Sequence, residues 1–362
     1  MADPAINKVL VEKGAVGYAL TEDILQRLPD TRVEQIADAQ SDNTDETFMG
    51  KGTLHLMTYK GKFLKPCPGT RNYICCGYQI LNFATNCPLN CSYCILQSYF
   101  NQPNLRVFVN LRENLKQVLQ TIDDHPERIF RIGTGEFTDS LALDDITWTS
   151  DLLVQEFSKR KNVILELKTK TDHIQRLLAS KHRDRIILSW SLNSPYISTH
   201  EEHRAISLEK RLKAARACQS EGFAIGFHFD PLVYHHNWKD GYSRTVELMD
   251  KYIDPKGIVW ISLGAFRYMP ALKSVIRKRH PNTCVLDGEF IPGLDGKMRY
   301  FKPIRIDLFT YMREKLETWH RDTGLYLCME SDDIWQKSLG WSPERSAGLK
   351  RFLDQRVEKF FG

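Results

Sequence analysis

Short apolar runs typical of β-strands alternate with amphipathic helical stretches from residue 78 onward. The runs that predict strands are Tyr78–Thr85, Ile129–Gly133, Val163–Leu167, Arg185–Leu192, Phe223–Phe229 and Gly257–Leu263. The stretches that predict helices are Glu113–Ile122, Thr149–Arg160, His173–Ser180, Leu208–Glu221, Ser243–Tyr252 and Leu272–His280. Gly222 follows one of these stretches and is expected to end its helix in the left-handed conformation.

Repeated strand–helix alternation predicts parallel strands with right-handed crossovers, and therefore an α/β sheet or a partial (β/α)6 barrel. In such folds, functional side chains gather at the carboxyl ends of the strands. We expect an N-terminal extension over residues 1–77, with short helices in 1–37 and a polar linker at 38–47. The barrel is expected over 78–280, and a C-terminal subdomain with a hairpin turn at Asp295-Gly296 over 281–362.

Composition supports a folded, soluble chain. Hydrophobic residues make up 42% and charged residues 26% of its 362 residues, which excludes a fibrous or largely disordered protein. No apolar run approaches the roughly 20 residues that cross a bilayer, and the first residues lack the apolar core of a signal peptide. We therefore expect a cytoplasmic monomer with no membrane partner. The net charge of +5 permits a nucleic-acid partner without requiring one.

The nine cysteines are unevenly distributed. Six of them fall between residues 67 and 94: Cys67, Cys75, Cys76, Cys87, Cys91 and Cys94. An odd total with one dense group favours a metal site over a disulfide framework. Cys87, Cys91 and Cys94 follow the first predicted strand with C-x3-C-x2-C spacing. Three such thiolates can hold a [4Fe–4S] cluster and leave one iron open to a chelating ligand, whereas structural zinc requires four ligands. Three incidental buried cysteines are the alternative.

This motif after a first strand resembles the radical S-adenosylmethionine (SAM) superfamily. The resemblance implies a [4Fe–4S] cluster, SAM as cofactor, a radical SAM partial barrel and a reducing partner of the flavodoxin or ferredoxin type. It also implies cleavage of SAM to methionine and a 5′-deoxyadenosyl radical. Tyr93 matches the aromatic position of the motif, and Gly135 and Glu136 resemble the glycine–glutamate motif that binds the SAM amino group.

Further SAM ligands are expected at the ends of the third and fourth strands. Lys168 and Lys170 end the third strand, whereas Ser191 and Asn193 end the fourth. We expect Lys170, Ser191 and Asn193 to contact SAM, and solvated strand ends are the alternative. The later strand ends place His228, Asp230 and Arg267 at the same mouth.

Longer runs resemble the spore photoproduct lyase family, including FATNCPLNCSYCILQSYF, LELKTKTDHIQRLL and PLVYHHNWKDGY. This resemblance covers somewhat more than half of the chain and implies reversal of a thymine–thymine photoproduct in DNA. Two positions depart from the family pattern: Glu136 stands where the family has a hydrogen-donor cysteine, and Ile95 where it has a relay tyrosine. The departures imply altered chemistry and poor lyase activity, unless a thiol such as Cys75 or Cys76 replaces the donor.

The remaining motifs leave alternatives open. Cys67, Cys75 and Cys76 could bind a second metal, supply a redox or hydrogen-donating thiol, or pack in a core. The candidate catalytic residues are therefore Tyr93, Cys75 and Cys76. The sequence at 200–203, HEEH, resembles a zinc-binding H-E-x-x-H motif but has the wrong spacing, so we expect a polar loop or a helix start.

Residues 270–315 carry ten Lys or Arg and five Asp or Glu, with aromatic residues between them. Basic groups between stacking rings suit contact with a nucleotide or a nucleic-acid strand, although a hairpin with a small aromatic core has the same pattern. We therefore expect a radical SAM enzyme that acts on a nucleic-acid base or nucleotide. A peptide or small metabolite is the alternative substrate, and a non-catalytic iron–sulfur module is the alternative function.

Overall fold

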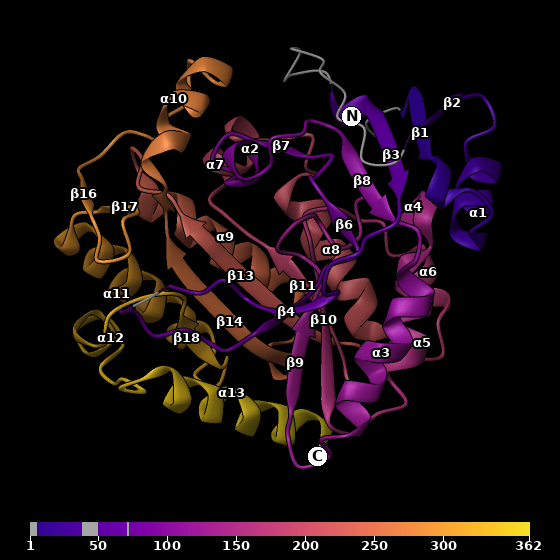
Figure 1. The fold of residues 1–362 in the computed structure, drawn as a ribbon. Coiled ribbons are helices and arrows are strands. Elements are labelled where there is room, and N and C mark those ends of the chain that lie inside the picture. The colour runs from indigo at the N-terminus through magenta and orange to yellow at the C-terminus, as the bar shows by residue number, and fades with distance from the viewer. Residues whose placement is uncertain (1–5, 38–49, 71) are drawn as a thin grey trace.

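The computed structural model describes residues 6–37, 50–70 and 72–362, and its centre is one curled sheet flanked by helices (Figure 1). The strand order is β18-β14-β13-β11-β10-β9-β5-β4. Neighbouring strands are parallel from β18 to β5, and only β4 runs antiparallel. The strands are β4 (Leu64–Pro66), β5 (Gln79–Leu81), β9 (Phe130–Gly133), β10 (Val163–Thr169), β11 (Ile186–Ser191), β13 (Ala224–Leu232), β14 (Ile258–Ala265) and β18 (Leu325–Leu327). The predicted α/β partial barrel is confirmed.

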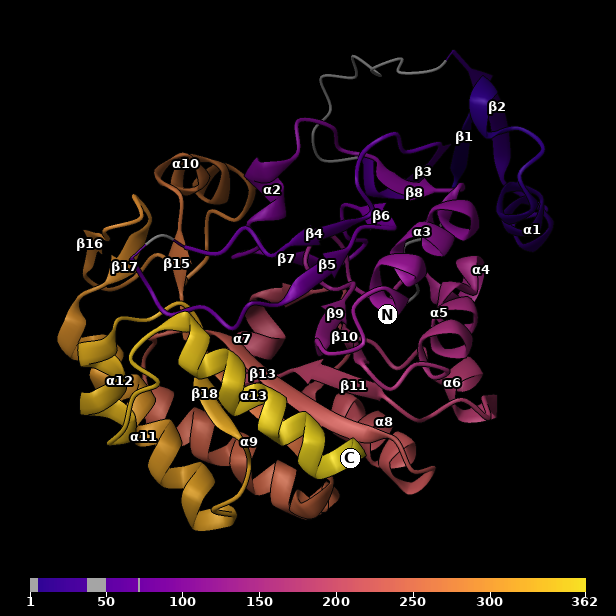
Figure 2. The ribbon, with the colours of Figure 1, turned by 60° about the horizontal axis from the view of Figure 1, so that its bottom comes forward.

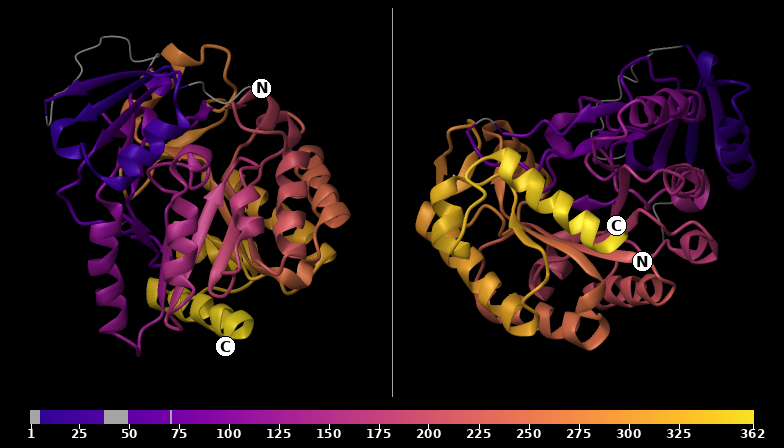
Figure 3. Two further views of the ribbon diagram at one scale, coloured as in Figure 1. Left: turned by 90° about the vertical axis from the view of Figure 1, so that its right-hand side faces the viewer. Right: turned by 90° about the horizontal axis from the view of Figure 1, so that it is seen from below.

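Helices cover the outer face of this curled sheet (Figures 1 and 3). They are α3 (Leu111–Asp123), α4 (Asp144–Thr147), α5 (Thr149–Phe157), α6 (Gln175–Ala179), α8 (Leu208–Ser220) and α9 (Trp238–Tyr252). The predicted helix α10 (Pro270–Arg279) lies apart from this layer, at the top of Figure 1. Every helix predicted between the strands is present. Gly222 has φ +89° directly after α8, which confirms the expected helix end.

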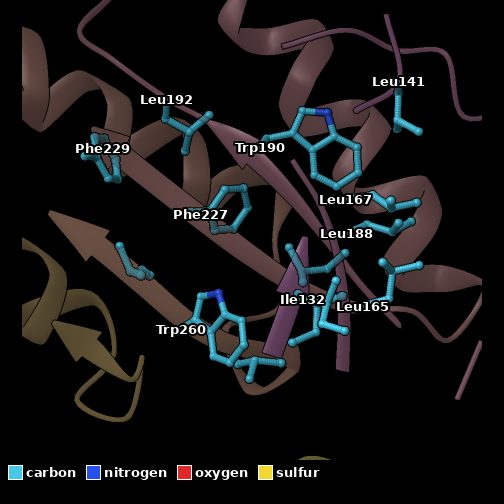
Figure 4. Packing of buried hydrophobic residues seen from close by; sticks show 14 of the residues in the cluster. Ile132, Leu141, Leu165, Leu167, Leu188, Trp190, Leu192, Phe227, Phe229 and Trp260 are labelled. Carbon is cyan, nitrogen blue, oxygen red and sulfur yellow. The ribbon is translucent and has the colours of Figure 1, made fainter. Parts of the chain in front are cut away.

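Side chains alternate between the two faces of the strands. Leu165, Leu188 and Phe227 belong to the buried apolar layer beneath the helices (Figure 4). On the same strands, Glu166 and Ser189 lie on the opposite face, where they hydrogen-bond to each other. The apolar layer holds the helices against the sheet, and the opposite face gives the barrel a polar interior.

Three strands of the N-terminal segment and two later strands form a second sheet in the order β2-β1-β3-β8-β6. Its elements are β1 (Lys8–Glu12), α1 (Ala19–Arg27), β2 (Arg32–Ile36), β3 (Thr53–Met57), β6 (Ala84–Thr85) and β8 (Leu105–Phe108). The short helices expected over residues 1–37 are wrong apart from α1 and one 3-10 turn. The apolar positions Val9, Leu10 and Val11 are consecutive and nearly fully buried, as in a strand covered on both faces. The linker expected at 38–47 lies outside the described residues.

The C-terminal segment adds a small sheet and three helices. Its elements are β15 (Arg267–Tyr268), β16 (Phe290–Pro292), β17 (Met298–Tyr300), α11 (Lys302–Trp319), α12 (Asp332–Leu339) and α13 (Ser346–Phe361). The antiparallel pairing of β16 with β17 and the φ of +75° at Gly296 confirm the predicted hairpin. Figure 2 shows α13 crossing the near side of the barrel beside β18.

Strands from all three expected segments join the large sheet, because β4 precedes residue 78 and β18 follows residue 281. The division into an extension, a barrel and a subdomain stays a prediction. Among the described residues, no helix is long and apolar enough to cross a membrane.

Candidate active site at the barrel mouth

The three motif cysteines lie on one loop between β6 and the short helix α2 (Leu96–Tyr99). Asn86 enters the loop with φ +66°, and its side-chain amide donates hydrogen bonds to the carbonyls of Gln102 and Asn104, both at 2.7 Å. Cys91 lies in β7 (Asn90–Cys91), and the backbone N–H of Cys94 donates to its carbonyl at 3.2 Å. The loop is therefore tied at its start and folded back on itself.

Burial and mutual proximity affect these thiols. Burial raises the pKa of Cys91 to about 12; Lys170 opposes the rise, and Glu202 and Cys94 add to it. Burial also raises the pKa of Cys87, with further contributions from Asp139, Cys94 and Cys91. Three neighbouring thiols in a low-dielectric loop suit a cation that displaces their protons and stabilises the thiolates.

This donor set and its burial fit an iron–sulfur cluster. Within the described part of the chain, no three His, Cys, Asp or Glu side chains converge in the arrangement that holds a metal ion. The assignment of Cys87, Cys91 and Cys94 as cluster ligands therefore stays a prediction, based on their spacing, shared loop and burial.

Glu201 holds the cluster loop in place through backbone and side-chain hydrogen bonds. Helix α7 (Pro195–His200) ends immediately before it, and β12 (Glu202–His203) pairs antiparallel with β7. The backbone N–H of Ser92 donates to the Glu201 carbonyl at 2.8 Å, and the Ser92 hydroxyl donates to its carboxylate. Thr283 Oγ1 donates to the same carboxylate at 2.6 Å.

Glu202 holds the aromatic residue of the motif. The Tyr93 hydroxyl donates to its carboxylate, and Arg211 Nη1 lies 2.6 Å from its other oxygen. Both Glu202 and Arg211 are almost completely buried, and Lys170 Nζ lies 5.8 Å from the centroid of the Tyr93 ring. The sequence predicts a polar loop or a helix start at 200–203, whereas α7 ends at His200 and β12 follows. The structure shows that the two glutamates of this segment position the cluster loop.

Glu136 follows β9, beside the end of β10. Its Oε1 accepts a hydrogen bond from Lys168 Nζ at 2.9 Å, and both side chains retain part of their exposure. Burial disfavours the Lys168 charge, but Glu136 outweighs it and raises the Lys168 pKa above its usual range. A Cβ at Gly135 would lie 3.0 Å from Lys168 Cβ, so glycine permits this close approach of the two strand ends.

The other predicted SAM ligands are at the same mouth, in different environments. Asn193 accepts from the Tyr242 hydroxyl at 2.8 Å and donates to the Pro231 carbonyl at 2.8 Å, so its amide joins two loops. Ser191 is buried at the end of β11, and its carbonyl accepts from Arg211. Contact of these residues and of Lys170 with SAM stays a prediction.

A buried polar network lies inside the barrel. Glu166 Oε1 accepts hydrogen bonds from Ser189 Oγ at 2.5 Å and Trp260 Nε1 at 2.9 Å, and it lies 2.8 Å from His228 Nε2. Burial disfavours the carboxylate, but His228 and these donors prevail and lower the Glu166 pKa to about 2. His228, predicted to lie at the mouth, therefore belongs to this network.

Asp230 and Arg267 pair across the ends of β13 and β14 at 3.2 Å. Arg267 Nη2 lies 3.7 Å from the sulfur of Cys328 and 3.4 Å from that of Met329. Asp230 and Arg267 thus occupy the mouth as predicted. Cys328 joins them from the end of β18, a position that sequence reasoning did not single out.

The basic segment at 270–315 is partly structural. Arg299 and Arg305 are buried and pair with Glu330, and the Phe290 and Tyr300 rings stack at 4.4 Å. The small aromatic core expected as the alternative therefore accounts for these residues. Arg277 and Lys278 on α10 are exposed, so basic surface remains beside the mouth.

Comparisons with known proteins agree with this architecture. A family model described as "Spore photoproduct lyase" matches residues 5–289. A spore photoproduct lyase of Bacillus subtilis (strain 168) is 26% identical over 85% of this chain and 90% of its own length. One from Clostridium acetobutylicum is 26% identical over 76% of this chain and 83% of its own length.

Solved structures show the same fold. A spore photoproduct lyase mutant with bound AdoMet and dinucleoside spore photoproduct superimposes with a TM-score of 0.79 and 22% identity, covering 91% of this chain and 100% of that chain. Another spore photoproduct lyase, complexed with the dinucleoside photoproduct, gives a TM-score of 0.78 over 90% of this chain and 99% of that chain, at 22% identity.

Proposed function

Since the chain belongs to the spore photoproduct lyase family of radical SAM enzymes, we propose that it acts on a thymine photoproduct in DNA. Modification of another nucleic-acid base is the second form of this proposal. The observation that carries it is a family match from residue 5 to residue 289, which spans both the cluster loop and the barrel mouth.

Cys87, Cys91 and Cys94 would hold a [4Fe–4S] cluster, and Glu136 with Lys170, Ser191 and Asn193 would hold SAM. When bound and reduced, this cofactor pair supplies a 5′-deoxyadenosyl radical that abstracts a hydrogen atom from the substrate. The chain's own contribution is positional. Glu201 and Glu202 fix the loop, and Gly135 lets the Glu136 carboxylate lie where it can meet an ammonium group.

A nucleic-acid substrate is supported by two observations. Spore photoproduct lyases of the same fold have been solved with a dinucleoside photoproduct bound. In this chain, α10 contributes the exposed Arg277 and Lys278, which suit contact with phosphates. We propose a low-potential electron donor of the flavodoxin or ferredoxin type as the second partner, and a cytoplasmic location.

By resemblance to the family, Glu136 stands at the position of the donor cysteine and Ile95 at that of the relay tyrosine, and we propose that these two residues change how the substrate radical regains its hydrogen. The Glu136 carboxylate cannot donate a hydrogen atom usefully. Ile95 directly precedes α2 and is 40% exposed, and its aliphatic C–H bonds are too strong to relay a hydrogen atom. Hydrogen return must therefore use other groups.

The test is anaerobic reconstitution, reduction and incubation with SAM and the dinucleotide photoproduct. We expect release of 5′-deoxyadenosine that depends on the photoproduct. Liquid chromatography measures this release. Release that does not respond to any photoproduct or nucleic acid would contradict the proposal. Binding to DNA that weakens steeply with added salt would support the nucleic-acid substrate, and absence of binding at low salt would favour a peptide or metabolite.

A further inference from the structure

A cysteine and a tyrosine face each other across the ribbon formed by β4 and β5. The register pairs Pro66 with Gln79, and the next pair is joined by a backbone hydrogen bond of 2.9 Å from Cys67 N–H to the Tyr78 carbonyl. Directly opposite residues in an antiparallel pair project their side chains to the same face. Cys67 and Tyr78 are therefore side-chain neighbours.

Tyr78 reaches into the barrel through a space that a glycine leaves open. A Cβ at Gly133 would lie 1.4 Å from the Tyr78 hydroxyl oxygen, so only glycine admits the phenol. The hydroxyl is buried, and among the described residues it has no hydrogen-bond partner. Buried hydroxyls without partners are uncommon in folded proteins and call for an explanation.

The Cys67 thiol interacts electrostatically with Glu136, the residue that by resemblance stands at the position of the family's donor. Burial and then the Glu136 carboxylate raise the Cys67 pKa to about 12. Cys76 and Cys328 are also near enough to Cys67 to interact with it electrostatically. A thiol with this pKa stays protonated at neutral pH and so keeps the S–H bond that a hydrogen-atom donor needs.

We propose that Cys67 donates a hydrogen atom to the substrate radical and that Tyr78 restores the Cys67 thiol. This inference rests on the proposed function, which supplies the radical. The two groups take over, from β4 and β5, the roles left vacant at Glu136 and Ile95.

The transfers balance as follows. The Cys67 S–H bond breaks, a C–H bond forms on the substrate, and Cys67 becomes a thiyl radical. The thiyl takes the hydrogen atom of the Tyr78 hydroxyl, which re-forms the thiol and leaves a phenoxyl radical. One electron from the low-potential donor that the enzyme already uses, with one proton from solvent, returns Tyr78 to a phenol.

The other free thiols in this region are placed less well. The Cys75 N–H donates to Ser346 Oγ at 3.0 Å, and its thiol lies 3.9 Å from the Thr70 carbonyl, on a turn outside the ribbon. Cys328 lies against Arg267 and Asp230. Glu136 exerts the strongest effect of any charged group on the pKa of Cys67, whereas on the pKa of Cys76 both Arg131 and Cys75 act more strongly than Glu136. Cys67 is thus the thiol most closely associated with the donor position.

The experiment compares 5′-deoxyadenosine with restored thymine pairs, using reduced, SAM-loaded enzyme and the dinucleotide photoproduct. In Cys67→Ala and Cys67→Ser, deoxyadenosine should still form, while thymine pairs per deoxyadenosine fall about tenfold or more, because neither side chain donates a hydrogen atom usefully. Tyr78→Phe should keep the first turnover and slow later ones by a similar factor. Cys218→Ala, in the core of α8, is the matched control and should behave as the unmodified chain.

The outcomes separate the two proposals. If the unmodified enzyme forms no deoxyadenosine in response to the photoproduct, action on a thymine photoproduct is overturned and this inference with it. If it does, and Cys67→Ala restores thymine pairs normally, only this inference is overturned. Loss of restoration in Cys76→Ala or Cys328→Ala, but not in Cys67→Ala, also overturns the assignment.

A measurement without cofactors checks the role of Tyr78. An unpartnered phenol contributes no hydrogen bond to stability, so cluster-free Tyr78→Phe should unfold at the temperature of the unmodified protein or above it. A fall of more than about 5 °C would show that the hydroxyl has a structural partner and would overturn the relay.

Discussion

Two buried tyrosines, Tyr93 in the cluster loop and Tyr78 directly before β5, have opposite chemical environments. The Tyr93 hydroxyl donates to Glu202, which is itself paired with the buried Arg211. The Tyr78 hydroxyl has no partner within the described residues and lies among Cys67, Cys76 and two carboxylates. A paired phenol fixes a loop, whereas an unpaired one is free to exchange its hydrogen. The region around Tyr93 and Glu202, the cluster side, is therefore held in place by hydrogen bonds. The region around Tyr78 and Cys67, the hydrogen-transfer side, is the one to which we assign hydrogen return.

The largest expected effect concerns the cluster side. Alanine in place of Cys87, Cys91 or Cys94 should abolish the broad iron–sulfur absorbance, at roughly 400 nm, and all SAM cleavage, because each thiolate holds one iron. Visible spectra and iron content after reconstitution measure the effect. Cys218→Ala and Cys284→Ala should load normally. Full loading in any one of the three variants would remove that residue from the ligand set.

The second prediction tests whether Glu202 holds the cluster loop in place. Glu202→Gln leaves the Arg211 charge buried without its partner and should destabilise the protein by about 3 kcal/mol, lowering its unfolding temperature by roughly 5 °C or more. Cluster loading should fall as well, since Tyr93 loses a charged acceptor. Glu209→Gln, on an exposed ion pair, is the control and should leave the unfolding temperature nearly unchanged. If Glu202→Gln keeps the unfolding temperature and the cluster loading of the unmodified chain, the loop keeps its position without this carboxylate.

The third prediction uses pH on the buried network beneath Tyr78. The Glu166 pKa of about 2 lies below the ordinary value of about 4.3, so its ionised form stabilises the fold above pH 4.3. That contribution, on the order of 3 kcal/mol, is lost as the pH falls from about 4.3 towards 2. Urea unfolding of cluster-free protein should therefore show a steeper acid loss in the unmodified chain than in Glu166→Gln. Parallel pH profiles would contradict the pairing with His228.

Much of the barrel followed from periodicity. The runs at Val163–Leu167 and Phe223–Phe229 appear as β10 and β13, because buried parallel strands give continuous apolar stretches. The N-terminal strands were missed, since β1 and β2 are short and β1 pairs with strands more than 20 residues away in sequence, β2 and β3. Local propensity does not show such pairings.

The candidate site likewise has features that follow from local sequence and features that depend on long-range contacts. The C-x3-C-x2-C spacing is local and could be recognised. The contacts of Glu201 and Glu202 bridge more than 100 residues, and those of Cys67 depend on strand register and on the missing side chain of Gly133. The two adjacent glutamates at 201 and 202 were the available signal for these contacts, but nothing in the sequence showed which loop they would contact.

The smallest expected effect shows whether Glu136 acts in SAM binding or in hydrogen return. If its carboxylate binds the SAM ammonium group, Glu136→Gln should weaken SAM binding about tenfold, the scale of one charge-assisted hydrogen bond. Titration calorimetry on cluster-loaded protein measures the affinity, and Glu221→Gln, on an exposed pair with Arg183, is the matched control. If Glu136 serves only to hold Lys168 near Cys67, SAM affinity should stay unchanged while the ratio of thymine pairs to deoxyadenosine shifts. Since Glu136 contacts Lys168 at 2.9 Å and also dominates the charge near Cys67, these two readouts, taken on one variant, place it on the cluster side or on the hydrogen-transfer side.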